Sequence, residues 1–369
     1  GTHGNADIFA LKYNAQGDTL WDYYYNGTNN YDDYVLAMDV DNSGNVFLTG
    51  TANGTGSFNQ MVTIKLNSNG VEQWIRLYGT AGTGESQGNS IAADDSGNVY
   101  VVGFYDGIST SKDWLVVKYS PAGQIQWSDL MNTPSNHDEY AVDVAVGPDQ
   151  KATVCGLVYD SAAAGGQNIL VKQYEIGGAI AWTDTYTNPT FIGSDVPKSI
   201  RYAPNGNIIV GGQTSNGSGL LTDALAISYS NTGTRQWATI YSDSTTVMDE
   251  QVYAMTIDEF GNIYLAASDY ISHVIFRFNA NGTLGWRKLW QGPLSNTNEV
   301  AFDISSDRNG GIYTIGKGIY PGPDYFANGG LDNMVVVKYS IAGDSLWTYR
   351  VASSTDLSIG FALDVRNGK

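Results

Sequence analysis

Residues 94–127 read DDSGNVYVVGFYDGISTSKDWLVVKYSPAGQIQW, and this stretch decides the fold. Two runs rich in β-branched and aromatic residues, Asn98–Val102 and Trp114–Tyr119, are separated by a loop. A Gly-containing turn then leads to a further run, Gln124–Leu130, and glycine supplies the positive φ that a tight hairpin turn requires. With an inner run such as Tyr34–Val40 placed before them, these segments predict four consecutive antiparallel strands.

The pattern recurs along all 369 residues. A glycine followed four residues later by tryptophan occurs seven times, and the spacings between the tryptophans are 53, 53, 55, 55, 49 and 61 residues. Copies of DDSGNVYVVG begin at Asp41, Asp94, Ala203, Asp258 and Asp307, with a divergent copy at Gly147. A unit of about 50 residues is too small to bury its own core, which argues against a row of separate β-sandwiches. Seven such units predict one all-β domain over residues 1–369, a seven-bladed β-propeller of four-stranded antiparallel blades.

The phrases LVVKYSPAGQIQW and DDSGNVYVVG resemble the SBBP-type repeat, a β-propeller repeat frequent in exported proteins of Bacteroidota. The resemblance covers essentially the whole chain. It implies the propeller fold and an exported protein. It implies no particular activity, because the motifs of this repeat are structural.

Composition limits the partners and the compartment. Lys and Arg number 19 against 37 Asp and Glu, a net charge of −18, so the chain should repel nucleic acid and anionic membranes and attract cations or basic partners. No apolar run approaches the ~20 residues of a membrane helix. The single cysteine, Cys155, excludes an internal disulfide and stands in an apolar run where we expect a buried, inert thiol. We expect an extracellular or cell-surface protein that neither binds nucleic acid nor spans a membrane.

The repeat register places both ends of the sequence within one blade. The inner strand of this last blade would come from about Ser358–Val365, and its outer strands from Ile8–Tyr13 and Thr19–Tyr25, so that N-terminal and C-terminal strands close the blade. One short second strand is missing from this arrangement. We expect either that the sequence is a fragment of a longer exported chain, or that a flanking or partner segment donates a strand to the slot.

Length variation between repeats is concentrated in the segment that holds the loop between second and third strands. This segment spans 21 to 33 residues, whereas the other half of the repeat spans 25 to 28. In a propeller this loop lies on the same face as the crossovers between blades, and insertions on one face often indicate a binding face. The longest loop, about Lys317–Leu331, is rich in aromatic residues and proline. The candidate ligand-binding residues in or beside these loops are Tyr105, Tyr270, Tyr320, Asp324, Tyr325 and Phe326.

An acidic residue stands near the start of each inner strand. The seven are Asp33, Glu85, Glu139, Asp195, Glu250, Glu299 and Asp356. If inner strands line a central channel, these side chains could form an acidic ring that holds a cation such as Ca²⁺. The alternative is a repeated structural clasp in which each carboxylate accepts backbone N–H bonds from the crossover loop.

Motifs for catalysis are weak. DVDNSGN from Asp39 opens like a calcium loop but has no acid at its twelfth position, so an Asx-type turn is the better interpretation. The three histidines, His3, His137 and His273, lie in different repeats, which argues against a zinc site, and we expect His137 and His273 to be exposed loop residues. No nucleophile elbow or phosphate-binding loop is present.

We therefore predict a non-catalytic binding or scaffold module that recognises a protein, peptide or glycan on its variable-loop face, with no obligatory cofactor. Two alternatives stay open. One is a hydrolase or lyase that uses carboxylates at the channel mouth, because the chain has many acids. The other is a structural segment of a larger adhesin or surface assembly.

Overall fold

The structure is a computed structural model that describes residues 6–27, 31–53, 58–79, 84–106, 111–132, 137–160, 166–217, 221–241, 249–269, 271–292, 299–319, 332–351 and 361–365. The chain divides into two compact units, unit 1 (Gly1–Tyr186) and unit 2 (Thr187–Lys369), and each is described by itself. Every regular element within the described ranges is a β-strand. In the same ranges we find no helix long and apolar enough to cross a membrane.

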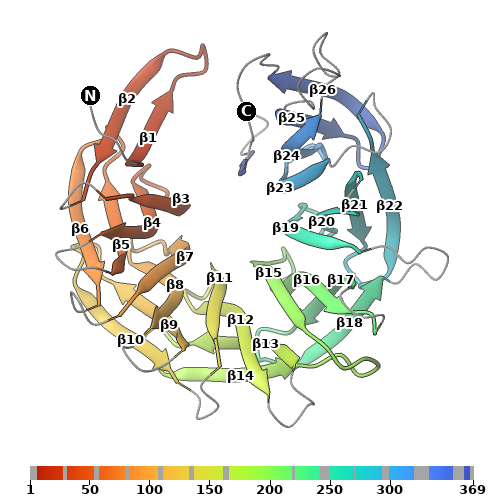
Figure 1. Cartoon of the computed structure of the whole chain (residues 1–369), viewed down its shortest axis with the longest axis horizontal. Helices are drawn as coiled ribbons and strands as arrows, with labels where there is room; N and C mark the ends of the chain where they lie inside the picture. Colours follow the sequence, from red (N-terminus) through yellow and green to blue (C-terminus); the bar gives the residue numbers. More distant parts are fainter. Residues whose placement is uncertain are drawn as a thin grey trace. The chain divides into compact units, whose positions relative to one another are not determined.

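Unit 1 contains a two-stranded sheet followed by three four-stranded sheets (Figure 1). The strands of the two-stranded sheet are β1 (Ile8–Tyr13) and β2 (Thr19–Tyr25). Those of the four-stranded sheets are β3 (Tyr34–Val40), β4 (Val46–Asn53), β5 (Asn59–Leu66) and β6 (Glu72–Tyr78); β7 (Ser86–Ala93), β8 (Val99–Asp106), β9 (Lys112–Tyr119) and β10 (Ile125–Met131); and β11 (Tyr140–Val146), β12 (Ala152–Asp160), β13 (Gly166–Tyr174) and β14 (Ile180–Tyr186).

Unit 2 contains three more four-stranded sheets of the same kind. Their strands are β15 (Asp195–Tyr202), β16 (Ile208–Ser215), β17 (Thr222–Tyr229) and β18 (Arg235–Tyr241); β19 (Gln251–Ile257), β20 (Ile263–Ser268), β21 (His273–Phe278) and β22 (Leu284–Trp290); and β23 (Val300–Ser306), β24 (Ile312–Ile319), β25 (Asp332–Tyr339) and β26 (Ser345–Val351). We call the members of each four-stranded sheet its first to fourth strand in chain order.

In all seven sheets consecutive strands pair antiparallel, so strand order follows sequence order. This confirms the predicted fold class: six complete four-stranded sheets and one two-stranded sheet are the inventory expected of a seven-bladed β-propeller. The expected outer strands of the last blade are present as β1 and β2. Residues 361–365 lie beside β23 within unit 2, where Leu363 donates its N–H to Asp303 (2.7 Å) and Val365 donates its N–H to the Ser305 hydroxyl (3.0 Å).

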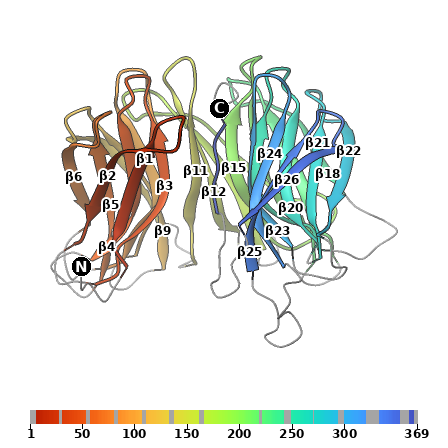
Figure 2. The ribbon, with the colours of Figure 1, turned by 90° about the horizontal axis from the view of Figure 1, so that it is seen from above.

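The turn between first and second strands is built on an acceptor side chain. In the second copy, Asp94 accepts the N–H groups of Ser96 (3.0 Å) and Asn98 (2.8 Å), and Gly97 takes a φ of +76°. The same bonds form at Asp41, Asp258 and Asp307, which confirms the interpretation as Asx-type turns. Figure 2 shows hairpin turns of this kind at one edge of the sheets.

The repeated tryptophans connect neighbouring sheets within each unit. Trp21 donates its indole N–H to the Ser68 carbonyl in the next sheet (3.1 Å), and a Cβ on Gly70 would lie only 2.5 Å from its ring. The matching contact recurs for Trp127 on Gly178 and for Trp237 on Gly282. These tryptophans are therefore packed against the hairpin glycine of the following sheet, not the glycine four residues before them.

Long polar side chains also serve the packing between sheets. Lys118 is almost fully buried, its ammonium lies 4.8 Å from the centre of the Tyr100 ring, and it donates to the Ile176 carbonyl in the next sheet (3.0 Å). The free thiol of Cys155 is buried in β12, as expected. The second and third strands are almost wholly buried in sheets such as β3–β6 and β7–β10, so we look for function at the edges of the sheets and in their loops.

Candidate functional site

Three of the acids predicted at the starts of first strands accept backbone hydrogen bonds: Asp33, Asp195 and Glu299. Asp33 is 1% exposed and accepts the N–H groups of Gly27 (2.5 Å) and Asn53 (3.0 Å). Asp195 accepts the Asn188 N–H (2.8 Å) and the Thr214 hydroxyl (2.5 Å). Glu299 accepts the Gly292 N–H (2.6 Å). Gly27, Asn188 and Gly292 stand two residues past β2, β14 and β22, respectively, so the carboxylates hold the crossover segments that follow these strands.

Burial dominates the electrostatics of these carboxylates. It raises the pKa of Asp33, an effect that the N–H groups of Gly27 and Asn53 partly offset and the nearby Asp7 and Asp32 reinforce. Burial likewise raises the pKa of Asp195 against the opposing bonds from Thr214 and Asn188. The donors stabilise the charged form of both groups, and this is the role that a clasp requires.

The residue before the acid makes a second clasp in three sheets. Asp138 accepts the N–H of Lys112 at the start of β9 (3.1 Å), and Glu139 donates its own N–H back to the Lys112 carbonyl (2.7 Å). Asp249 and Glu250 hold Thr222 in the same way, and Asp32 and Asp33 hold Ala6. Two successive acidic positions therefore fasten the segment before a first strand to the start of β9 or β17, or to the residue that leads into β1.

The remaining acids take different positions. Glu85 is half-buried and accepts from the Asn59 side chain (3.3 Å), while Asp356 lies outside the described residues. Within the described ranges, no group of three or more His, Cys, Asp or Glu side chains could hold a metal ion. The clasp is thus seen directly at three of the seven acids, and a cation-binding ring of all seven stays a prediction.

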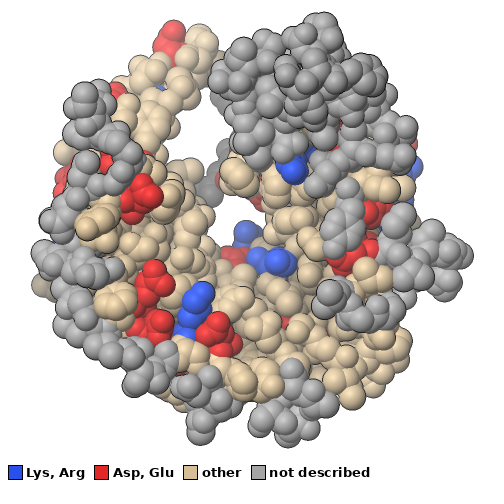
Figure 3. All heavy atoms as spheres, viewed as in Figure 1, with Lys and Arg blue, Asp and Glu red and all other residues tan. Residues whose placement is uncertain are grey.

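Most of the predicted ligand-binding residues lie outside the described residues: Tyr270, Tyr320, Asp324, Tyr325 and Phe326. Tyr105 is described. It stands near the end of β8, half-buried, and its ring would lie 3.5 Å from a Cβ on Gly79, in the crossover that follows β6. Figure 3 shows acidic side chains spread over the drawn face, with Lys and Arg at few places.

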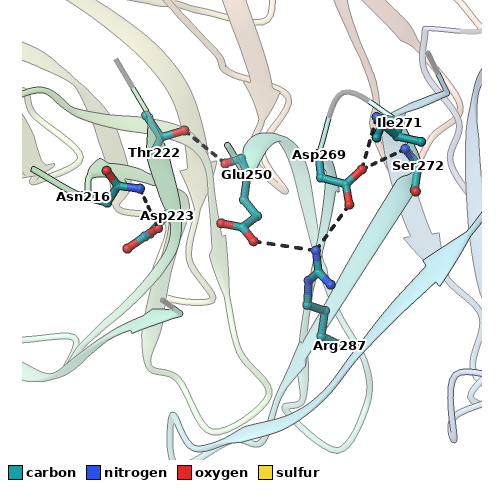
Figure 4. Close-up of polar contacts among 8 residues, drawn as sticks. All are labelled: Asn216, Thr222, Asp223, Glu250, Asp269, Ile271, Ser272 and Arg287. Atoms are coloured by element: carbon teal, nitrogen blue, oxygen red, sulfur yellow. Dashed lines mark hydrogen bonds and ion pairs between the residues drawn. The ribbon is translucent and has the colours of Figure 1, made fainter. Parts of the chain in front are cut away.

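One polar cluster in unit 2 breaks the repeat symmetry (Figure 4). The guanidinium of Arg287, on β22, lies between Glu250 (Nη2 to Oε1, 3.7 Å) and Asp269 (Nη2 to Oδ2, 3.4 Å). Asp269 follows β20 and also accepts the N–H groups of Ile271 and Ser272 in the short loop to β21. Both carboxylates are buried and the Arg287 side chain is 17% exposed. One cation therefore neutralises two buried anions in part, and it packs near the Tyr241 and Phe276 rings.

This cluster was missed in the sequence, although a signal for it exists. Arg287 follows the repeat tryptophan Trp286, and the residues at that position in the other repeats are Asp22, Ile75, Ser128, Thr183, Ala238 and Thr348. A cation at a repeat position where no other copy has one indicates a local function or a local ion pair. Asp269 stands out in the same way, because its loop is the shortest between second and third strands.

A second cluster in unit 2 contains a histidine that was expected to be exposed. That expectation is wrong: His273 begins β21, is 0% exposed, and its ring lies tilted against that of Trp290, with 4.9 Å between the ring centres. Its Nε2 lies 3.2 Å from the Lys317 carbonyl and must donate to it, whereas its buried Nδ1 has no hydrogen-bond partner among the described residues. Burial lowers the pKa of His273 to about 4, because the hydrogen bond to Lys317 does not compensate and Arg350 is close.

Lys198 is a third exception to the repeat. It stands at the bulge of β15, between Pro197 and Ser199. The corresponding bulge residues of the other first strands carry no charge: Leu36, Asn89, Val142, Tyr253 and Phe302. Its ammonium makes no hydrogen bond or ion pair within the described ranges, and burial lowers the pKa of Lys198. Lys198 is half-buried, and partial removal of an unpaired ammonium from water costs folding free energy.

The comparisons with known proteins agree on the fold. The family model of the SBBP beta-propeller repeat matches residues 73–103. An uncharacterised WD repeat-containing protein of Acanthamoeba polyphaga mimivirus is 24% identical over a match that covers 42% of this chain and 15% of that protein. The chain therefore matches only a small part of this relative's length.

Solved seven-bladed propellers show the same architecture. A protein from Lactobacillus plantarum matches with a TM-score of 0.55 and 12% identity over 86% of this chain and 84% of its own. Virginiamycin B lyase from Staphylococcus aureus matches with a TM-score of 0.51 and 12% identity over 87% and 85%. Identities this low show a shared fold alone.

Proposed function

We propose that the chain is a non-catalytic binding or scaffold module, exported to the cell surface or the extracellular space. It recognises a protein, peptide or glycan with the loops between second and third strands and the crossovers beside them. The export rests on composition: a net charge of −18 with few lysines suits an extracellular protein.

One observation supports the binding edge above all others. Every turn between first and second strands, and every turn between third and fourth strands, has five residues between its strand ends. The loops between second and third strands instead have 5, 5, 5, 6, 4 and 12 residues between strand ends, in chain order. Because both kinds of connection belong to the same sheets, packing does not explain why only one edge varies. Variation confined to one edge is typical of recognition loops on a rigid scaffold.

The charged residues support the same assignment. The acids that recur once per repeat hold crossover segments, as at Asp33 and Asp195, so their chemistry is used within the fold. The residues free to contact a ligand are therefore the non-repeated residues of the variable loops.

A second candidate function rests on the Arg287 cluster. Glu250 and Asp269 both approach one guanidinium, and paired buried carboxylates are the groups that a hydrolase or lyase uses for acid and base chemistry. One neighbour of the same fold is named as a lyase. The burial of both carboxylates and the hydrogen bonds that fix Asp269 favour a structural ion pair instead.

The test is a loop graft. Residues 320–331 would be replaced by the five residues of the β8–β9 loop, GISTS at 107–111, and both proteins would be screened on glycan and peptide arrays. For ligands that the unaltered protein binds, we expect an affinity loss of about tenfold or more with an unchanged melting temperature. The matched control replaces the turn at 340–344 by the turn at 67–71, on the opposite edge, and should bind normally.

Equal binding by the graft and the control would contradict the assignment of the longest loop. Mass spectrometry of each array ligand after incubation decides the catalytic alternative. Conversion of a ligand that stops in Glu250→Gln or Asp269→Asn would favour a hydrolase or lyase.

A further inference from the structure

The bulge of each first strand holds one residue that has no partner in the neighbouring second strand. In the three complete sheets of unit 2 these residues are Lys198, Tyr253 and Phe302. Two residues after the bulge, the same three strands each have a buried apolar side chain: Ile200, Met255 and Ile304. The bulge residue instead ranges from a charged to an aromatic side chain. The fold therefore determines the buried position and leaves the bulge position available for a local function.

The bulge side chains reach from one sheet to the next. The rings of Tyr253 and Phe302 lie edge to face, with 5.3 Å between their centres. In unit 1, Asn89 at the bulge of β7 donates to the Ala141 carbonyl, directly before the bulge of β11 (2.8 Å). β15 contacts β19, as β19 contacts β23, and Figure 1 shows these three strands in succession along unit 2. By the same repeat geometry, Lys198 lies beside Tyr253.

Other polar residues at the bulge have a partner inside the fold. Tyr253 donates its hydroxyl to Gln251, two residues before it (3.1 Å), and Asn89 accepts from the glutamine at the same place in β7 (2.7 Å). The residue at that place before Lys198 is Val196, whose side chain has no acceptor. Lys198 makes no hydrogen bond or ion pair within the described ranges, and no carboxylate there opposes the lowering of its pKa by burial. This ammonium therefore lacks the counter-group that its position elsewhere receives.

The acid in this row of residues, Asp303, is already engaged. Asp303 follows Phe302 and accepts the N–H groups of Ile304 (2.8 Å) and Leu363 (2.7 Å). Burial raises the pKa of Asp303, whereas these two donors and the nearby Arg201 favour its charged form. The charge of Asp303 is thus stabilised within the fold, and Lys198 is left to attract an anion from outside.

We propose that Lys198, Tyr253 and Phe302 bind the C-terminal residue of a peptide whose last side chain is aromatic. The terminal carboxylate accepts from the Lys198 ammonium, and the aromatic side chain packs against the two rings. Both rings are half-buried, so the site is open to solvent along the strands. A free aromatic acid would stay partly exposed there, whereas sites for small molecules enclose most of the ligand surface. A peptide gains further contacts beside the rings.

A bound carboxylate also explains why the chain keeps Lys198. A half-buried ammonium without a counter-ion lowers stability, and an apolar residue at this position, as in Leu36 or Val142, avoids that loss. A residue that destabilises the free protein and gains its partner in the complex is typical of a binding site.

The experiment titrates the whole chain into an acetylated peptide, Gly-Ser-Gly-Ser-Gly followed by para-fluorophenylalanine, and follows the peptide by fluorine NMR. We expect a saturable change of the fluorine signal. The same peptide with a C-terminal amide should bind about tenfold more weakly or less, because it lacks the charge that pairs with Lys198. N-acetyl-para-fluorophenylalanine has the same ring and carboxylate without the preceding residues, and should bind more weakly than the peptide.

On the protein side, Lys198→Met should weaken binding of the carboxylate peptide by about tenfold or more and leave binding of the amide peptide unchanged. The variant should fold, because it loses an unpaired ammonium. Lys198→Arg keeps the cation and should keep most of the affinity. Phe302→Leu should weaken both peptides, since it removes one ring. Lys288→Met is the matched control, because it removes a lysine at the surface, and it should bind as the native protein does.

Three results would each overturn the inference: no binding, equal binding of the carboxylate and amide peptides, or equal binding by Lys198→Met and the native protein. Binding of the free acid as tight as that of the peptide would overturn the peptide as the occupant. The loop graft leaves β15, β19 and β23 unchanged, so failure there and failure here are distinguishable.

Discussion

Trp74 donates its indole N–H to the Pro121 carbonyl of the next sheet at 3.0 Å, and its ring fills the space above Gly123. A Cβ on Gly123 would lie 2.7 Å from Trp74 Cδ2, and Gly123 has a φ of +74°. The glycine is therefore required twice, for the turn conformation and for the packing of the preceding tryptophan. The repeated glycines and tryptophans therefore form the same contact between successive sheets.

Gly123→Ala should destabilise the protein by about 3 kcal/mol, because it combines a strained positive φ with an overpacked contact against a ring. Urea denaturation measures the change. The matched control is Gly17→Ala, at the same repeat position with a φ of +90° but no atom within 4 Å of the added Cβ. It should cost only about 1 kcal/mol of backbone strain. Equal losses in the two variants would show that the tryptophan contact contributes nothing.

Arg287→Met should lower the free energy of unfolding by about 3 kcal/mol, because it leaves the buried carboxylates of Glu250 and Asp269 without their cation. Adding Asp269→Asn to this variant should recover part of the loss, since one buried charge is removed. Lys288→Met is the control, because Lys288 pairs with Asp344 at the surface and should change stability by less than about 0.5 kcal/mol. A loss for Arg287→Met no larger than this control would contradict a stabilising ion pair.

Lys198→Met should raise the melting temperature, with a gain of about 1 kcal/mol near neutral pH. The change removes an ammonium that burial disfavours and puts an apolar side chain where other first strands have Leu36 or Val142. Because burial lowers the pKa of Lys198, the gain should shrink as pH rises and the native lysine loses its charge. Thermal scans at neutral and alkaline pH measure both effects. A lower melting temperature for the variant would indicate that Lys198 has an essential partner.

The sheets could be predicted from the sequence because the same pattern of strands and turns recurs in each repeat. Tyr34–Val40 was predicted as a strand and is β3 residue for residue, and the turns at Asp41 and Asp94 follow from local chemistry alone. The Trp74–Gly123 contact was not predicted, because the two residues belong to different repeats and only packing brings them together. The same is true of Arg287 and Glu250.

Single residues were harder to place than the repeat. His273 was expected in an exposed loop, but the short connection after β20 starts β21 at that residue and buries its ring. Periodicity identifies strands shared by all copies, whereas a shortened loop in one copy shifts the strand boundary locally. The candidate ligand-binding residues fall mainly in the loop between Ile319 and Asp332, where the repeat offers no template.

Asp195→Asn should reduce stability by about 2 kcal/mol, because the new amide group must face either the Thr214 hydroxyl or the Asn188 N–H that the carboxylate now accepts.

A clasp of this kind needs no metal. Added Ca²⁺ or a chelator should therefore not change the melting temperature of the native protein. The same should hold for a variant with Gln at Glu139 and Glu250 and Asn at Asp195. A rise with Ca²⁺ in the native protein alone would instead favour the acidic ring.

His273 should make stability depend on pH between about 4 and 6.5. Its pKa falls from 6.5 to about 4 on folding, so the unfolded chain binds more protons in this range and folding weakens as pH falls. Stability from this source is fully present above about pH 6.5 and is lost as pH falls towards 4. Between pH 7 and 4.5 the native protein should lose about 2 kcal/mol more than His273→Gln, whose side-chain amide still donates to Lys317. Urea denaturation at both pH values measures the difference, with His137→Gln as the control at an exposed histidine. Parallel losses in the native protein and His273→Gln would show that the buried ring does not titrate in this range.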